Sequence, residues 1–232
     1  MKTKSLKAAY DVFLGTVNVL TAIAKMVEDY HFEKAVRMLT RTKKHIWTLG
    51  MGKAGMIAHK LASTLSSNAT PAAFINAGEA LHGDFGAIQE GDILVAFSNS
   101  GQTSEVMQVV HKAITIGAKV ILITGHGREL AKSADAILLY GRIKEACPLG
   151  LTPTTSIAVM LAISDALAMA VQAEKGLTPA EYAMNHHAGY LGQIAREKAR
   201  RQCKELSGDP GANLKHTSNS KGSKRSRRNI SG

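Results

Sequence analysis

The sequence has little cysteine, and this scarcity excludes the disulfide-rich class of small extracellular folds. Among its 232 residues there are two cysteines, Cys147 and Cys203, which lie far apart and in unlike surroundings. Two such residues do not form a disulfide framework, and neither belongs to a group with metal-ligand spacing. We therefore predict a fold that is held together without disulfides and a chain without a cysteine-based metal site.

Long hydrophobic runs are also absent. No stretch of about 18 apolar residues is free of polar or charged ones, which argues against a transmembrane helix. The first residues, M-K-T-K-S-L-K, lack the apolar region and cleavage site of a secretory signal. We expect a soluble, cytoplasmic protein with no membrane partner.

Positive charge is in excess, but it is concentrated at one end. The net charge is +11, and residues 196–232 hold 11 Lys and Arg against 3 Asp and Glu, so +8 lies there and +3 in the rest. From Ser207 onward no residue is aromatic, a composition typical of disorder. The run K-R-S-R-R at 224–228 offers a contact for nucleic acid, although a solvated end is the simpler interpretation.

Strands and helices are predicted to alternate along the middle of the chain. Five apolar stretches have the length of buried strands: residues 45–49, 72–75, 93–97, 119–124 and 136–140. The alternation predicts an α/β fold, with a five-stranded, mainly parallel sheet flanked by helices in a three-layer sandwich. We place this domain at residues 45–195, between N-terminal helices in 1–44 and a basic, disordered tail at 196–232.

Two predicted helices carry more apolar surface than a small sheet covers. Apolar residues recur at steps of three and four over residues 5–29, which predicts one long amphipathic helix, and a shorter helix follows at 31–41. Residues 157–173 are apolar on all sides, as in a buried helix. An interface between subunits is the natural place for both faces, and Asp165 inside the second helix needs a partner.

A hydroxyl-rich loop follows the third strand. It lies after residues 93–97 and before an amphipathic helix, where free N–H groups and the positive end of the helix dipole favour an anion. The hydroxyls of Ser98, Ser100 and Thr103 surround Gly101, whose missing Cβ lets the backbone approach a ligand. We predict a phosphate-binding loop. The alternative is that one hydroxyl merely caps the helix, but the loop offers three.

A glycine pattern after the first strand suggests a dinucleotide site at first sight. Gly50, Gly52 and Gly55 match G-x-G-x-x-G between a strand and a helix. That motif requires an acidic residue at the end of the next strand, where this chain has Asn76, and the first carboxylate after the glycines is Glu79. We therefore expect no nicotinamide or flavin cofactor.

An acid–base pair is possible past the second strand. Glu79 and His82 stand three residues apart and would share a face of a short helix. The alternative is that His82 is a structural residue.

Four motifs stand together in this sequence: G-M-G-K-A-G at residue 50, G-E-A-L-H-G-D-F-G at 78, S-N-S-G-Q-T-S-E at 98 and E-A-C-P-L-G-L-T-P-T-T-S at 145. Together, over about residues 5–195, they resemble the sugar isomerase domain of D-arabinose-5-phosphate isomerases. The segment E-A-C-P-L-G-L is specific to that family, whereas many sugar-phosphate isomerase domains share the serine-rich loop.

The resemblance implies an activity and an assembly. The activity is a cofactor-independent interconversion of D-ribulose 5-phosphate and D-arabinose 5-phosphate, which feeds 3-deoxy-D-manno-octulosonate synthesis for lipopolysaccharide or capsule. The assembly is a homotetramer whose active sites are shared between subunits.

The resemblance also implies the site residues. The functional lysine falls on Lys53, the glutamates on Glu105 and Glu145, and the late histidine on His186. Isomerisation through an enediolate needs a base, either His186 or Glu145, and groups such as Lys53 and Glu105 beside the sugar oxygens. The substrate-binding positions are Gly52, Thr70, Asn76, His82, Ser98, Asn99, Ser100, Gly101 and Thr103.

The sequence departs from the family pattern in three places. Asn76 replaces a histidine that can take a metal, so we predict no metal site. The usual H-P-G-G is His186-His187-Ala188-Gly189, which leaves two histidines competing for one role. The regulatory modules of most relatives are missing from this sequence, which therefore resembles the short members, and feedback through such modules is not expected.

Three rival hypotheses remain, and one of them, a nucleic-acid-binding protein, rests only on the basic tail. An isomerase from a neighbouring branch would share the phosphate-binding loop but lack E-A-C-P-L-G-L. A non-catalytic sugar-phosphate-binding regulator would keep the hydroxyls and lose the acid–base residues.

Overall fold

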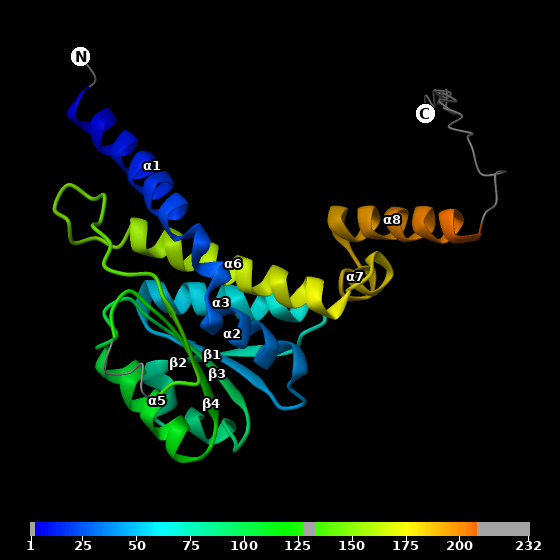
Figure 1. Ribbon diagram of the computed structural model, residues 1–232, viewed down its shortest axis with the longest axis horizontal. Helices are drawn as coiled ribbons and strands as arrows, with labels where there is room; N and C mark the ends of the chain where they lie inside the picture. The colour runs from blue at the N-terminus through cyan, green and yellow to red at the C-terminus, as the bar shows by residue number, and fades with distance from the viewer. Residues whose placement is uncertain (1–2, 128–132, 208–232) are drawn as a thin grey trace, which may run out of the picture.

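A single parallel sheet forms the centre of the protein (Figure 1). The computed structural model describes residues 3–127 and 133–207. Its five strands stand in the order β2-β1-β3-β4-β5, and every neighbouring pair is parallel. The predicted α/β fold with a five-stranded sheet is confirmed. The strands are β1 (Ile46–Gly50), β2 (Ala72–Asn76), β3 (Ile93–Ser98), β4 (Lys119–Thr124) and β5 (Ala136–Leu139).

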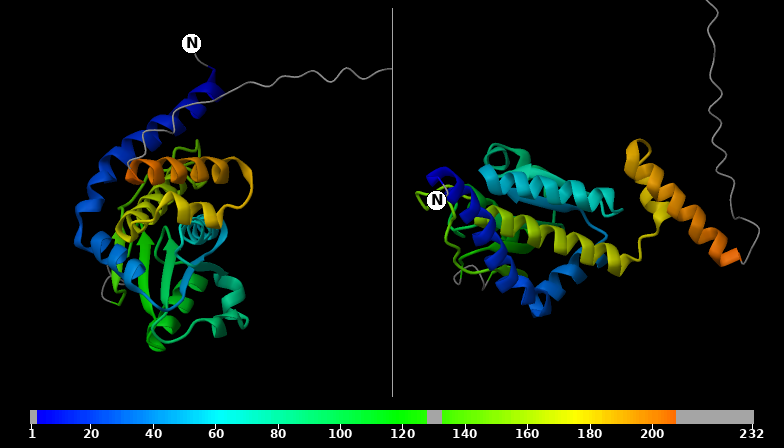
Figure 2. Two further views of the ribbon diagram at one scale, coloured as in Figure 1. Left: turned by 90° about the vertical axis from the view of Figure 1, so that its right-hand side faces the viewer. Right: turned by 90° about the horizontal axis from the view of Figure 1, so that it is seen from above.

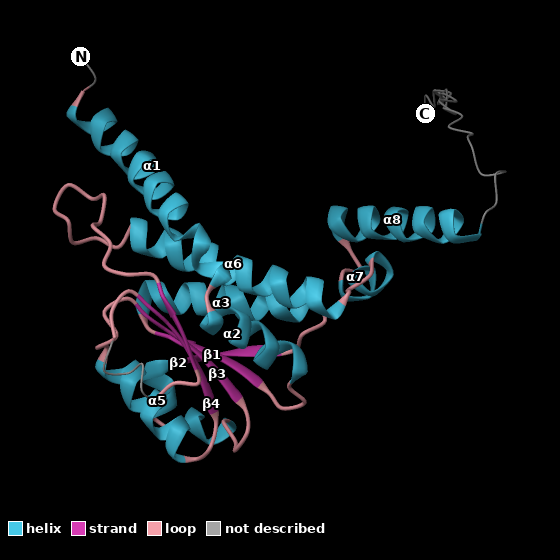
Figure 3. Ribbon diagram, in the orientation of Figure 1, coloured by secondary structure: helices cyan, strands magenta, loops and turns pink. Residues whose placement is uncertain are grey.

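Helices cover both faces of this sheet, so the architecture has three layers (Figures 1 and 3). Helices α2, α3 and α6 pack on one face, and α4 and α5 on the other. The helices are α1 (Lys4–Ile23), α2 (Tyr30–Arg41), α3 (Gly52–Ser67), α4 (Ala77–Leu81), α5 (Ser104–Thr115), α6 (Thr155–Lys175), α7 (Pro179–Asn185) and α8 (Gly189–Ser207), with 3-10 turns η1 (Ala24–Glu28) and η2 (Asp84–Ala87).

The central strand β3 shows why its sequence is apolar without alternation. Ile93, Val95 and Phe97 point into the core under α2, α3 and α6, whereas Leu94 and Ala96 point into the core under α5. All six residues of β3 are buried. A strand covered on both faces needs apolar residues at every position, and burial of each large side chain contributes roughly 1.5–3 kcal/mol.

The N-terminal helix is shorter than predicted. The helix expected over residues 5–29 ends at Ile23, and η1 continues to Glu28. Its C-terminal half packs on the core through side chains such as Leu20, while the other half projects from the body with Phe13 75% exposed (Figure 1).

Two helical segments are long and apolar enough to cross a membrane by length and composition, Lys4–Glu28 and Thr155–Lys175. The second is α6, a core helix whose Leu167 and Val171 are buried against the neighbouring helices. Asp165 in α6 pairs with Lys60 of α3, so this carboxylate has the partner that its position requires.

The C-terminal helices form an arm that extends away from the sheet, as the views in Figures 1 and 2 agree. Helix α7 packs closely on α8. The prediction of a disordered tail from residue 196 needs correction, because 196–207 belong to α8. Residues such as Arg, Lys, Glu and Ala in that stretch favour a helix, which outweighs the basic composition. The run at 224–228 lies outside the described residues.

Candidate functional site

The predicted phosphate-binding loop lines a cavity at the carboxyl edge of the sheet. The cavity measures about 330 Å³. The amino-terminal ends of three helices reach it: Lys53 belongs to the first turn of α3, Thr103 precedes α5, and Ser156 belongs to the first turn of α6. The ends of α3 and α5 have no side-chain cap, so they present free N–H groups and the positive end of a dipole, and Lys53 adds a positive charge. The end of α6 is different, because Glu145 accepts hydrogen bonds from its N–H groups. The arrangement therefore suits an anionic ligand.

The hydroxyls of the loop are arranged for a ligand and not for capping. Thr103 is the N-cap residue of α5, but its side chain makes no capping hydrogen bond. Its hydroxyl lies 3.2 Å from that of Ser98, and both line the cavity. Ser100 accepts a bond from the N–H of Gln102 at 3.1 Å, which leaves its own proton available. The alternative that these residues only cap the helix is not supported by this geometry.

Ser156 is a site residue that the sequence analysis did not single out. The residue lines the cavity, and its buried hydroxyl makes no hydrogen bond of ordinary geometry with the described residues, although it lies close enough to Glu145 to help lower the pKa of that carboxyl. Buried hydroxyls are rarely left unpaired, and a bound ligand would supply the missing partner. The signal in the sequence is the T-T-S run at the start of a helix, which resembles an ordinary N-terminus.

Residues that follow β4 and β5 hold the loop after β3 in place through hydrogen bonds to Asn99. The hydroxyl of Tyr140 donates to Oδ1 of Asn99 at 2.7 Å. The backbone carbonyl of Asn99 accepts from the N–H of Gly125 at 3.1 Å and lies 3.1 Å from Nδ1 of His126. Burial, and then the charge of Glu145, raise the pKa of Tyr140, so its hydroxyl keeps its proton as a donor. These contacts fix the position of Asn99.

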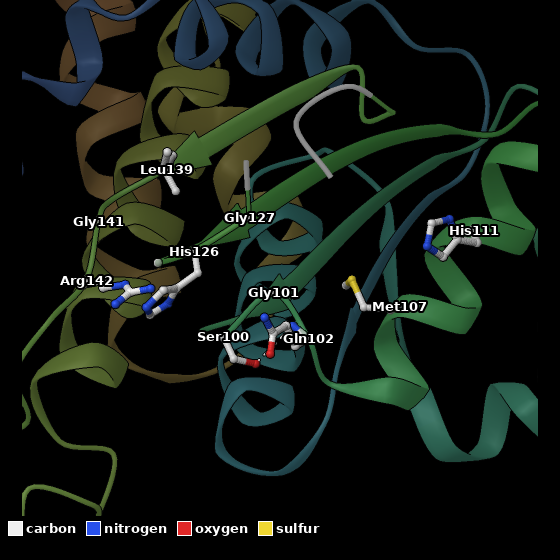
Figure 4. Close-up of a pocket in the computed structure, with 11 residues that line it drawn as sticks. Ser100, Gly101, Gln102, Met107, His111, His126, Gly127, Leu139, Gly141 and Arg142 are labelled. Atoms are coloured by element: carbon white, nitrogen blue, oxygen red, sulfur yellow. Dashed lines mark hydrogen bonds between the residues drawn. The ribbon is translucent and has the colours of Figure 1, made fainter. Parts of the chain in front are cut away.

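A second, larger cavity lies on the other side of the same loop. It measures about 860 Å³, and Figure 4 shows His126 and Arg142 side by side at one wall, with Ser100 and Gln102 at another. The loop thus separates two cavities, and its conformation affects both.

Gly101 is the position where the loop tolerates no side chain. Its φ is +64°, and an added Cβ would lie 2.6 Å from the carbonyl oxygen of His126. We expect Gly101→Ala to lower the free energy of unfolding by about 1–3 kcal/mol more than Gly52→Ala does. Gly52 is a matched control, because its φ is +56° and an added Cβ meets no atom within 4 Å. Thermal unfolding of both variants checks this, and equal losses would contradict it.

The glycine pattern after β1 serves close packing. A Cβ on Gly50 would lie 2.8 Å from the backbone nitrogen of Gly55, so strand and helix approach each other only because both residues are glycines. Asn76, at the end of β2, uses its side chain to cap α4 at the N–H of Gly78, 2.8 Å away. The last residue of β2 is thus an amide engaged in a helix cap, where dinucleotide-binding folds have a carboxylate for the ribose.

Glu145 is fixed at the start of α6. One of its oxygens accepts from the N–H of Thr154 at 2.8 Å, from the hydroxyl of Thr154 at 3.1 Å and from the N–H of Ser156 at 3.2 Å. Burial opposes ionisation, but hydrogen bonds from Ser156 and Thr154 outweigh it and hold the pKa of Glu145 below its ordinary value. Glu145 therefore carries a negative charge at neutral pH and orders the segment beside the cavity.

Cys147, two residues further on, has an activated thiol. Its sulfur accepts from the N–H of Leu151 at 3.2 Å and of Thr152 at 3.1 Å. Burial acts in the opposite direction, but the hydrogen bonds from Thr152 and Leu151 prevail and lower the pKa of Cys147 to about 7.

Alkylation by iodoacetamide tests this thiol. Because the thiolate reacts and the pKa is depressed, the rate should rise with pH and reach half its maximum near pH 7. A Cys203→Ser variant isolates the signal of Cys147. A midpoint at the ordinary value of about 8.5 would contradict the prediction.

The remaining predicted residues lie in three different parts of the structure. Lys53 lines the cavity, and Glu105 stands in the first turn of α5, close in sequence to the loop. Asn76 ends β2 and the exposed His82 follows α4, so both lie on the far side of β1 from the loop. Thr70 needs correction: it precedes β2 at the opposite edge of the sheet and accepts a hydrogen bond from Lys175 at 2.8 Å.

His186 lies at the end of α7, on the projecting arm and away from the cavity of its own chain (Figure 1). Its ring stacks on Tyr182 with centroids 3.9 Å apart, and Nδ1 lies 2.9 Å from the carbonyl oxygen of Tyr182. A carbonyl oxygen accepts only, so Nδ1 carries the proton and Nε2 remains free to accept one. His187 is exposed.

No group of three or more His, Cys, Asp or Glu that could hold a metal ion occurs in the parts of the chain at 3–127 and 133–207.

Comparisons with known proteins show which proteins this chain resembles. The family described as SIS domain matches residues 38–170. Arabinose 5-phosphate isomerase KpsF of Escherichia coli is 37% identical over 175 residues, which are 75% of this chain and 55% of that protein. Arabinose 5-phosphate isomerase KdsD of Pseudomonas aeruginosa is 39% identical over 172 residues, which are 74% of this chain and 52% of that protein.

A solved structure is also similar. A protein of E. coli CFT073 in complex with arabinose 5-phosphate superposes with a TM-score of 0.70 at 31% identity, over 80% of this chain and 100% of that one. The chain spans a little over half the length of the curated relatives KpsF and KdsD.

Proposed function

Since the chain belongs to the SIS domain family, we propose that it is an aldose–ketose isomerase that interconverts D-ribulose 5-phosphate and D-arabinose 5-phosphate. The observation that carries the proposal is the cavity at the convergence of three helix amino termini, lined by Lys53 and the hydroxyls of Ser98 and Thr103. The names of the relatives KpsF and KdsD, and the arabinose 5-phosphate bound in the E. coli CFT073 protein, support this substrate.

The phosphate of the sugar binds to the loop after β3. The hydroxyls of Ser98, Ser100 and Thr103 donate to its oxygens, together with backbone N–H groups at the start of α5. Ser156 and Lys53 line the same cavity, where the rest of the sugar lies. This binding mode uses the substrate's phosphate to position carbons C1 and C2.

Isomerisation moves one proton between these carbons. A base removes a proton from C1 of the ketose, and an enediolate forms. The hydroxyl proton passes from the oxygen on C1 to the oxygen on C2, and the base returns its proton to C2 to give the aldose. Lys53 stabilises the negative charge that develops on the oxygens. Of the two candidate bases we assign His186, because its Nε2 is free to accept a proton, whereas hydrogen bonds hold the pKa of Glu145 below its ordinary value and make this carboxylate a weaker base.

His186 reaches the site from another copy of the chain. In its own chain it lies on the projecting arm, and the arm carries exposed apolar residues such as Met184, Tyr190 and Leu191. The outer half of α1 exposes a further apolar face. Such faces are typical of subunit interfaces. We propose that the protein is a homotetramer whose active sites are shared between subunits, and that it is located in the cytoplasm. Light scattering would measure the mass of the assembly in solution and so give the number of subunits.

The proposed reaction is tested by incubating the purified protein with D-ribulose 5-phosphate and following the products by NMR. We expect arabinose 5-phosphate and no other pentose phosphate, without added metal or cofactor. Formation of a different sugar phosphate would assign the protein to another branch of the family. Saturable binding without turnover would identify a sugar-phosphate-binding regulator.

A further inference from the structure

A separate cavity lies at the edge of the sheet where the strands begin, and we name it the amino-edge cavity. It measures about 360 Å³ and lies between α2 and the first residues of β3 and β4, Ile93 and Lys119. The candidate active site lies where the parallel strands end. The two cavities are therefore at opposite edges of the sheet and share no residue.

Helix α2 presents one basic face to the amino-edge cavity. Phe32, Ala35 and Leu39 are buried in the core on one side of the helix. Lys34, Arg37 and Arg41 follow at steps of three and four and line the cavity on the other side. The fold of the core thus fixes three cations along one wall.

The charge of this cavity is not balanced. Four cations line it, because Lys119 faces the three of α2, and no carboxylate does. Arg37 pairs with Glu33, but in the part of the chain that the structure describes no ion pair joins Lys34, Arg41 or Lys119 to a carboxylate. Like charges gathered in one concavity repel each other, and a bound anion would relieve the repulsion.

The two acidic residues that flank Gly91 in sequence make their contacts elsewhere. Asp92 is buried, and its carboxylate accepts from the N–H of His45 at 3.1 Å, from Nε1 of Trp47 at 3.0 Å and from the N–H of Gln89 at 2.9 Å. Glu90 lies with its carboxylate against Gly117. Neither lines the cavity.

The lining also indicates the kind of anion. A phosphate group carries about −1.5 to −2 charges at neutral pH, so two such groups match the three cations that have no ion pair. The planar guanidinium of Arg41 suits phosphate oxygens. Tyr30 at the wall is 61% exposed and offers a ring face, and Met38 and Ile93 offer apolar surface to an organic moiety. A concavity of this volume fits a small molecule.

We propose that the amino-edge cavity binds a small molecule that carries two phosphate groups, held by Lys34, Arg37, Arg41 and Lys119. This site does not depend on the isomerase activity, and its test measures binding alone.

The test uses inorganic pyrophosphate as the probe in isothermal titration calorimetry. Because pyrophosphate can also bind the loop after β3, the titration is carried out on a Ser98→Ala/Ser100→Ala background. We expect one pyrophosphate per chain, and at least about tenfold weaker binding when Lys34→Ala/Arg41→Ala is added, because the variant loses two cations that contact the phosphate groups.

A matched control separates local contacts from overall charge. Lys198→Ala/Arg201→Ala removes the same charge from exposed positions of α8 and should change the affinity by less than about twofold. Circular dichroism checks that each variant folds, and Lys34→Gln/Arg41→Gln replaces the alanine pair if it does not.

Three outcomes would overturn the proposal. The first is that the background variant binds no pyrophosphate. The second is that the α2 and α8 variants lose pyrophosphate affinity equally. The third is that the protein binds a single-stranded oligonucleotide through Lys34 and Arg41 but does not bind pyrophosphate. The last outcome would identify a polyanion surface instead of a small-molecule site.

Discussion

His186→Ala is expected to lower kcat for ribulose 5-phosphate isomerisation by about 10²- to 10⁴-fold, the usual contribution of a general base. Binding of the sugar phosphate should persist, because the loop after β3 is intact. The physical reason is that Nε2 of His186 is the free nitrogen of a ring whose Nδ1 is held by the carbonyl of Tyr182. Steady-state kinetics and calorimetry measure the two effects separately.

His187→Ala is the matched control for this variant. His187 is exposed and neighbours His186, so its loss should leave kcat within about twofold, as for most surface substitutions. Full activity in His186→Ala, with a large loss in His187→Ala, would exchange the roles of the two histidines.

Mixing two inactive variants tests whether the site is shared. Lys53→Ala removes the cation beside the cavity, and His186→Ala removes the base from the arm. If each site takes Lys53 from one chain and His186 from another, random subunit exchange in an equal mixture leaves about a quarter of the sites with both residues intact. We expect activity to return to about that fraction after exchange. Activity that stays at the sum of the two variants would place both residues in one chain's site.

Ser98→Ala/Ser100→Ala is expected to reduce kcat/KM by about 10²-fold or more, since each hydrogen bond to a charged phosphate is worth about 1.5–3 kcal/mol. Most of the change should appear in KM, because the phosphate binds equally in the ground state and the transition state. Kinetics over a range of substrate concentrations separate the two constants.

Ser104→Ala supplies the control for the loop variant. Its hydroxyl stands in the first turn of α5, one residue after Thr103, but accepts from Nε2 of Gln108 at 3.0 Å and does not line the cavity. Its kinetics should resemble those of the unaltered protein. An equal rise of KM in Ser104→Ala would mean that the loop acts through the helix and not through direct contacts.

The fold could be predicted from the sequence because its strands carry strong local signals. The run from Ile93 to Phe97 is apolar at every position, and the structure shows β3 covered on both faces. The position of the loop that we propose as the phosphate site was predictable for the same reason, since it follows directly from the strand before it and the helix after it.

Other features depend on contacts that sequence spacing does not encode. The unpartnered hydroxyl of Ser156 becomes visible only when α6 is placed with its first turn at the cavity. The family resemblance assigns Thr70 to the site, but the parallel arrangement puts the start of β2 at the other edge. The cations of the amino-edge cavity come from α2 and from Lys119 of β4, about 80 residues away in sequence, and only the fold brings them together.

The projecting arm has a further consequence. If His186 at the end of α7 acts in the site of a different copy, which binds the phosphate, then an isolated chain has no complete active site, however well it is folded. Turnover per chain would fall on dilution, with a midpoint set by the dissociation constant of the subunits. A change in the concentration of the protein would then change the activity of each chain as well as the number of chains.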